Sequence, residues 1–152
     1  MKKICLLLLF TTFPLNLFCQ QSNEMVLDSS YSYHWDSKTN NWIRYSRHVY
    51  AFDVNGNLTE YAYYHWDSET NDLVGDSRYV YTYDANRSLT GEIYNTWDSE
   101  TNDWVNSSRI VYAYDANGNL TEFIWYNWDS EINDWAGNDR WVHAYDANRY
   151  LT

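Results

Sequence analysis

The chain has 152 residues, of which 20% are aromatic and 20% are charged, and its formal net charge is −11. So acidic a chain repels nucleic-acid phosphates and anionic lipid surfaces, which excludes nucleic acid as a partner. Its two cysteines, Cys5 and Cys19, both lie in an N-terminal segment that we interpret as an export leader. The mature domain is therefore expected to lack disulfides, zinc–thiolate sites and thiol catalysis.

Residues 1–19 have the organisation of a secretory signal peptide. Lys2 and Lys3 form a short positive region, and an apolar run at residues 4–13 follows it. A run of about ten apolar residues is too short to cross a bilayer as a stable helix but is typical of an export signal. We therefore expect no membrane span, and a mature chain with 8 basic and 21 acidic residues.

Cleavage is expected between Cys19 and Gln20, which predicts a secreted or outer-surface protein. Lipid anchoring at Cys19 is the less favoured alternative, because the bulky Phe18 stands where a lipobox needs a small residue. Residues 20–26 then form a short linker before a single domain at residues 27–152.

The domain consists of four copies of a 31-residue unit. Trp-Asp pairs, aromatic-Asp pairs and Leu-Thr pairs all recur with this period and without any insertion. The pairs begin at Trp35, Trp66, Trp97 and Trp128, at Phe52, Tyr83, Tyr114 and Tyr145, and at Leu58, Leu89, Leu120 and Leu151. The last unit is incomplete, since the sequence stops two residues into an expected strand. A fragment of a longer gene is one interpretation.

Each unit predicts two antiparallel strands. In the third unit they cover residues 104–114 and 120–128, which are rich in aromatic and β-branched residues and contain no proline. A polar six-residue loop at 98–103 makes the other connection. We therefore predict an all-β fold of about eight strands in an open, curled antiparallel meander. A closed barrel is disfavoured, because too many large aromatic side chains would point into a narrow bore.

The turn between the two strands has a recognisable chemistry. In the third unit Asp115 is expected to cap it, and Gly118 to supply a left-handed residue. Arg87 and Arg149 stand where the other units have glycine, which should cost about 1 kcal/mol in each turn if φ stays positive.

Strict alternation from the pair Tyr114–Leu120 assigns the side chains to two faces. The expected core face collects Ile110, Tyr112, Tyr114, Leu120, Ile124, Tyr126, Trp128, Trp135 and Trp141. The opposite face collects Arg109, Val111, Ala113, Thr121, Phe123, Trp125 and Asn127. In this register no bulge is needed for the tryptophans that flank each six-residue loop to close it as cross-strand pairs. These loop-closing residues are Trp35, Trp42, Trp66, Trp97, Trp104, Trp128 and Trp135, with Leu73 in place of one tryptophan.

The stretch Tyr-Ala-Tyr-Asp-Ala-Asn-Gly-Asn-Leu-Thr at 112–121 resembles the Tyr-Asp repeats of the RHS and teneurin class. The resemblance spans residues 27–152 and implies β-hairpin ribbons in a secreted or surface-exposed bacterial protein. The segment Trp-Asp-Ser-Glu-Thr-Asn-Asp-Trp at 97–104 departs from the shorter RHS unit. It is closer to tandem repeats of exported Bacteroidetes proteins of unknown function. Four units cannot build the closed shell of RHS proteins, so the resemblance implies no activity.

No pattern in the sequence indicates catalysis or a cofactor. None of the four histidines, at 34, 48, 65 and 143, keeps one position in all units, and no nucleophile, base and orienting group stand together. We therefore expect a protein that is not an enzyme. Asp98, Glu100 and Asn102 alternate as calcium ligands can, but the loop lacks the glycine and distant glutamate of an EF-hand. A solvated loop capped by aspartate is the preferred interpretation, and no metal site is expected.

One aromatic row is the candidate ligand site. Tyr63, Tyr94 and Trp125 share one repeat position on the non-core face, so they should lie two strands apart, about 9.5 Å. Rings at that spacing could stack on a neutral glycan, or the face could pack against another surface protein. The sequence therefore favours a structural or adhesive interaction module, with a carbohydrate-binding module as the alternative.

Overall fold

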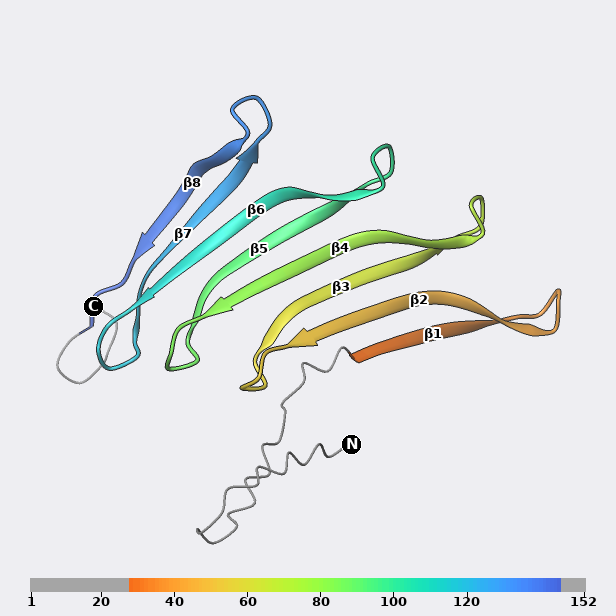
Figure 1. Cartoon of the computed structure of the whole chain (residues 1–152), viewed down its shortest axis with the longest axis horizontal. Coiled ribbons are helices and arrows are strands. Elements are labelled where there is room, and N and C mark those ends of the chain that lie inside the picture. The colour runs from red at the N-terminus through yellow and green to blue at the C-terminus, as the bar shows by residue number, and fades with distance from the viewer. Residues whose placement is uncertain (1–27, 146–152) are drawn as a thin grey trace, which may run out of the picture.

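The structure is a computed structural model that describes residues 28–145 (Figure 1). These residues form eight strands and no helix. The strands are β1 (Asp28–Asp36), β2 (Asn41–Phe52), β3 (Leu58–Asp67), β4 (Asp72–Tyr83), β5 (Leu89–Asp98), β6 (Asp103–Tyr114), β7 (Leu120–Asp129) and β8 (Asp134–Val142). They pair in chain order in one open antiparallel sheet, which confirms the predicted fold class. The expected leader, the linker and the turn at Arg149 lie outside the described residues.

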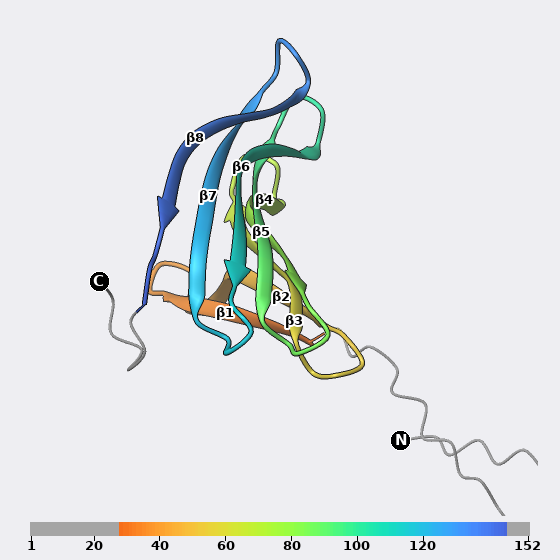
Figure 2. The same ribbon diagram turned by 90° about the vertical axis from the view of Figure 1, so that its left-hand side faces the viewer.

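The sheet is a single layer. Figure 2 shows that neither face is covered by a second layer of described residues, and that the strand direction turns progressively from β1 to β8. Ala62 is the one apolar side chain of the described residues that is buried, and the buried polar side chains are Ser46 and Asn95. Cross-strand contacts on the two faces therefore hold this sheet together in place of a shared core.

Two bulges recur in the units, so the expectation of strands without a bulge is wrong. After the Tyr-Asp turn, Tyr114 does face Leu120, but Ala113 faces Glu122, which leaves Thr121 as an extra residue. The Thr121 hydroxyl donates a hydrogen bond of 3.1 Å to the carbonyl of Ala113. A second bulge follows the tryptophan loop; in the third unit it lies in β6, where Ser107 is the extra residue.

The bulge after the turn corrects the assignment of faces. Tyr112 stands opposite Phe123, and Ile110 stands opposite Trp125, so these residues share one face although we assigned Phe123 and Trp125 to the face opposite Tyr112 and Ile110. An extra residue in one strand shifts its alternation by one position relative to the partner strand. Tyr126 consequently stands opposite Arg109, on the other face.

We name the two faces by the residues that characterise them. The tyrosine face carries His48, Tyr50, Tyr61, Tyr63, Tyr79, Tyr81, Tyr83, Glu92, Tyr94, Ile110, Tyr112, Tyr114, Phe123, Trp125 and Trp141. The arginine face carries Arg47, Ala62, Tyr64, Trp66, Gly75, Arg78, Asn95, Trp97, Trp104, Arg109, Ile124, Tyr126, Trp128, Trp135 and Arg140.

The turns have the predicted chemistry. Gly56 and Gly118 have φ angles of 82° and 81°, and Arg87 keeps the same left-handed conformation at 68°. The Asp115 carboxylate accepts hydrogen bonds from the backbone amides of Asn117 and Asn119, at 2.8 and 2.9 Å. These turns fix the register of each hairpin at its closed end.

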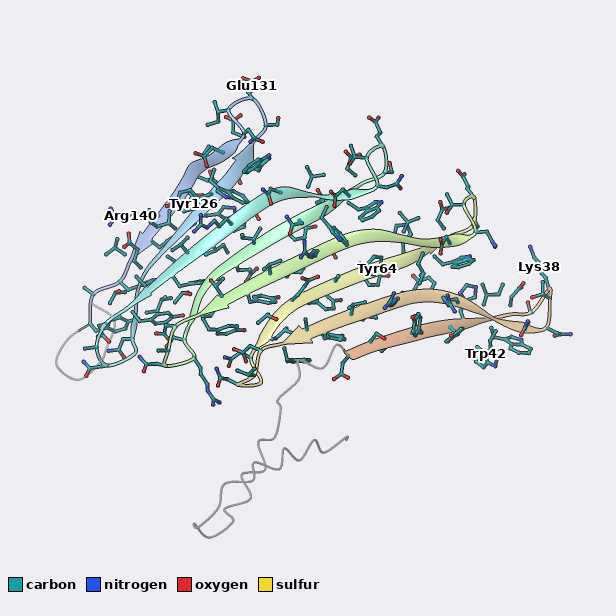
Figure 3. All side chains as sticks on the ribbon, in the orientation of Figure 1. Lys38, Trp42, Tyr64, Tyr126, Glu131 and Arg140 are labelled. Atoms are coloured by element: carbon teal, nitrogen blue, oxygen red, sulfur yellow. The ribbon has the colours of Figure 1, made fainter. Side chains whose placement is uncertain are left out.

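The loop-closing tryptophans pair as predicted, although on the arginine face. Their ring centroids lie 5.4, 5.0 and 5.0 Å apart, edge to face, in the pairs Trp35–Trp42, Trp97–Trp104 and Trp128–Trp135. In the second unit Trp66 stands opposite Leu73. The loops that they close project from one end of the sheet, where Figure 3 labels Lys38 and Glu131.

Candidate functional site

The tyrosine face is a nearly continuous layer of aromatic rings across the middle of the sheet. The ring centroid of Tyr79 lies 6.1 Å from that of Tyr61 and 4.9 Å from that of Tyr94. Tyr61 in turn lies 5.2 Å from Tyr50. These contacts link β2, β3, β4 and β5 through their side chains. The rings therefore cover this face and also hold the neighbouring strands together.

The predicted row lies within this layer. Tyr63, Tyr94 and Trp125 are on β3, β5 and β7, on one face, as their shared repeat position requires. Tyr79 stands directly opposite Tyr94, and Ile110 stands directly opposite Trp125, on the intervening strands. The row is therefore part of a wider aromatic surface. Among the three residues of the row, Trp125 is the most exposed, at 37%.

The central part of the tyrosine face carries little charge. Glu92 stands opposite Tyr81 and Ile110, and burial among these side chains raises the pKa of its carboxyl group. Burial, with the Glu92 charge as a second cause, raises the pKa of Tyr81 to about 12. Burial likewise raises the pKa of Tyr112. These two phenols therefore stay neutral at physiological pH and offer hydroxyl groups that can both donate and accept hydrogen bonds.

An arginine recurs on the other face with the full period of the repeat. Arg47, Arg78, Arg109 and Arg140 occupy one repeat position on β2, β4, β6 and β8. The 31-residue spacing of these arginines is visible in the sequence, but the prediction rested on aromatic and turn residues and did not include it. Arg78 donates a hydrogen bond of 2.7 Å to Glu60, and Arg140 pairs with Glu122.

The central part of the arginine face contains the buried residues Ala62, Gly75 and Asn95. The indole of Trp97 lies against Gly75, so closely that a Cβ atom at Gly75 would be 2.4 Å from its Cε3. Tyr64 reaches toward the same place, with its ring centroid 5.8 Å from that of Trp104. The buried Nε1 of Trp97 has no hydrogen-bond partner among the described residues. This cluster serves packing, because its polar groups are covered.

One histidine of the described residues lies between a serine and a tyrosine. The Nδ1 atom of His48 lies 2.9 Å from the Tyr61 hydroxyl, and its Nε2 atom lies 3.5 Å from the hydroxyl of Ser46. Ser46 is buried, and its hydroxyl also lies 2.7 Å from that of Ser32, so these side chains form a hydrogen-bonded chain between β1, β2 and β3. No group of three potential metal ligands is present within residues 28–145. In the loop considered for calcium, both Asp98 carboxylate oxygens accept hydrogen bonds from the loop itself, from the Glu100 amide and the Thr101 hydroxyl, at 2.9 Å each. No helix of the described part is long and apolar enough to cross a membrane.

Fold and surfaces together define a single-layer antiparallel β-repeat protein with two exposed faces. The DUF3836 family, a family of unknown function, matches residues 68–144, about half of the chain. The chain therefore belongs to this family.

Two solved structures that are similar to this chain come from Bacteroides and Parabacteroides. A protein of unknown function from Bacteroides fragilis NCTC 9343 is 19% identical, has a TM-score of 0.57, and aligns over 80% of this chain and 93% of its own. A DUF3836 family protein from Parabacteroides distasonis ATCC 8503 is 17% identical, has a TM-score of 0.49, and aligns over 77% of this chain and 90% of its own. No curated protein matches the chain. The B. fragilis structure shares the fold of this chain, and a sequence identity of 19% supports no statement about function.

Proposed function

We propose that this protein is an exported, non-enzymatic interaction module of the bacterial cell surface, with the tyrosine face as its docking surface. The observation that carries the proposal is the nearly continuous aromatic layer on a face of a single-layer sheet that no described residues cover. Aromatic rings left against water are costly, and large apolar patches of this kind mark interaction sites. The leader expected at residues 1–19 supports export, and the resemblance to Tyr-Asp repeat proteins supports a place at the surface.

The chemistry of the tyrosine face suits a neutral partner. The Tyr81 and Tyr112 phenols are uncharged, and the whole chain has a net charge of −11. The face carries acidic groups at Glu92, at Asp28 opposite Tyr50, and at Asp139 opposite Trp125. Tyrosine and tryptophan provide large rigid contact areas at low entropic cost, which makes them frequent in protein-binding surfaces. We therefore place a protein of the cell surface first among the partners.

A neutral glycan is the second candidate, and one observation favours it. Tyr63, Tyr94 and Trp125 repeat on alternate strands, and a ligand running across the strands would gain a weak contact at each of them. Such binding grows with the number of contacts through multivalency. The exposure of Trp125, 37%, leaves its ring accessible for stacking on a sugar.

The test is a binding screen of the chain from Gln20 onward against neutral polysaccharides and outer-surface protein fractions. Trp125→Ala and Tyr94→Ala remove rings of the tyrosine face. Tyr126→Ala is the matched control, because Tyr126 follows Trp125 in β7 and stands on the opposite face. We expect about tenfold weaker binding of the two tyrosine-face variants and unchanged binding of the control. Equal effects of all three variants in folded proteins, or no binding in the screen, would refute the proposal.

A further inference from the structure

The two outer strands carry much of the exposed apolar surface of the sheet. Within the described residues β1 and β8 each have one strand neighbour, so one backbone edge of each is unpaired. Tyr31, Tyr33 and Trp35 of β1 are 43%, 49% and 50% exposed. Trp141 and Val142 of β8 are 39% and 67% exposed. Unpaired edges of this kind are templates for strand addition.

Inside the sheet, a tryptophan of the next strand covers the position that is open at the β8 edge. In the middle of the sheet, Trp97 of β5 lies over Gly75 of β4, and a Cβ atom there would be 2.4 Å from the indole. Gly137 holds the same repeat position in β8, but a Cβ atom at Gly137 would have no described atom within 4 Å. Trp35 holds the repeat position of Trp97 and is exposed on β1. At the β8 edge, Gly137 thus has open space where an indole lies over Gly75; we call this space the empty indole site. At the β1 edge, the indole of Trp35 is exposed.

We propose that β1 of a second copy of this chain adds to the outer edge of β8, antiparallel and in the register that β7 has on β6. In that register Arg109 faces Tyr126, and Val111 faces Ile124. Advancing these pairs by one repeat places Tyr33 of the second copy opposite Arg140, and Tyr31 of the second copy opposite Val142. Trp35 of the second copy then covers Gly137.

Each of these contacts has a counterpart inside one chain. The guanidinium carbon of Arg47 lies 6.0 Å from the ring centroid of Tyr64, the residue opposite it on the neighbouring strand. Arg140 would meet Tyr33 in the same way, as a cation over an aromatic ring. Figure 3 shows Arg140 on the outermost strand of the sheet, where such a partner can reach it. The new backbone ladder would extend the one that already joins successive units.

The geometry makes the association head to tail. One copy offers β8 and the next offers β1, so each added copy again exposes a free β8 edge. Such heterologous contacts grow into chains of copies and do not stop at a symmetric dimer. The chain from Gln20 onward has 8 basic and 21 acidic residues, and its negative charge opposes the approach of identical copies. Added salt should therefore strengthen the association by screening this repulsion.

The experiment measures the mass of the chain from Gln20 onward by sedimentation velocity, from about 1 to 100 μM, the range in which modest interfaces associate. We expect masses that rise with concentration in whole multiples of one copy, and more so at higher salt. Monomers at every concentration and salt would overturn the proposal.

Two variants test the register. Gly137→Leu fills the empty indole site in open space, so it should leave the melting temperature unchanged and reduce the association at least tenfold. Trp35→Ala should reduce the association to the same extent from the other edge, with only a small change in stability. Ile132→Ser is the control, because Ile132 is 65% exposed but lies in a loop. Association that survives Gly137→Leu, or that Ile132→Ser weakens equally, would overturn the register.

Mixing the two variants tests the direction. The Gly137→Leu protein keeps a functional β1, and the Trp35→Ala protein keeps a functional β8. Each variant alone should be monomeric, and their mixture should give one-to-one heterodimers that grow no further. A mixture that stays monomeric, or that forms larger assemblies, would contradict head-to-tail addition.

Discussion

The tryptophan pairs at the centre and at the edge of the sheet have the same geometry but different surroundings. Trp97 and Trp104 lie 5.0 Å apart at 77°, and Trp35 and Trp42 lie 5.4 Å apart at 73°. The central pair is half-buried against Gly75, whereas Trp35 and Trp42 are 50% and 62% exposed. The hairpin sequence therefore sets how two rings meet, and neighbouring units set how much surface the pair buries.

Truncating one ring in each place should give the largest difference. We expect Trp97→Ala to lower the free energy of unfolding by about 3 kcal/mol, at the low end for buried tryptophan because the indole is half-buried. Trp35→Ala should cost less than about 1 kcal/mol, as exposed substitutions do. Urea unfolding at low protein concentration, followed by circular dichroism, measures both. Similar losses would show that loop closure, and not the cover over Gly75, provides the stability.

A methyl group added to the glycine beneath the indole tests the same difference between the centre and the edge of the sheet, at Gly75 of β4 and Gly137 of β8. Gly75→Ala places a Cβ atom 2.4 Å from the Trp97 ring and should cost about 1–3 kcal/mol. Gly137→Ala meets no described atom within 4 Å and should change stability by less than about 0.5 kcal/mol. Thermal unfolding of the two proteins side by side gives the comparison. Equal stability would mean that the Trp97 ring moves aside without cost.

The conformational cost of a side chain at positive φ should be the same in every Tyr-Asp turn, whether the turn lies at the centre or at the edge of the sheet. Arg87 has a φ of 68° where Gly118 has 81°, so Arg87→Gly should stabilise the protein by up to about 1 kcal/mol. Gly118→Arg should destabilise it by a similar amount. Urea unfolding measures both changes. A loss of stability in Arg87→Gly would indicate that the arginine side chain contributes more than its backbone strain costs.

The smallest expected effect concerns a charge on the tyrosine face. Burial raises the pKa of Glu92, so its ionised form destabilises the fold, and stability falls as pH rises through the folded pKa. Glu92→Gln should therefore stabilise the protein at pH 7 by less than about 1 kcal/mol, because solvent screens the partly exposed carboxylate. The gain should vanish below the unfolded pKa of glutamate, about 4.3. Glu60→Gln, which removes the partner of Arg78, should show no gain at pH 7.

Some features of the site could be predicted and others could not. Asp115 and Gly118 identify the turn because Asp caps it and Gly tolerates positive φ, and both act locally. The row of Tyr63, Tyr94 and Trp125 follows from the period. The bulge at Thr121 escaped prediction, because counting alternate residues cannot show which strand contains an unpaired one. Because the extra residue Thr121 was not anticipated, Tyr126 was assigned to the wrong face.

The sequence by itself determined the eight strands, their order, the turns and the tryptophan pairs, since each depends on residues within one or two units. Only the tertiary structure decided which aromatic sets share a face and which pairs are covered. Those outcomes depend on an extra residue in one strand and on the presence of a next strand. The burial of Trp97 over Gly75 and the exposure of Trp35 differ for that reason.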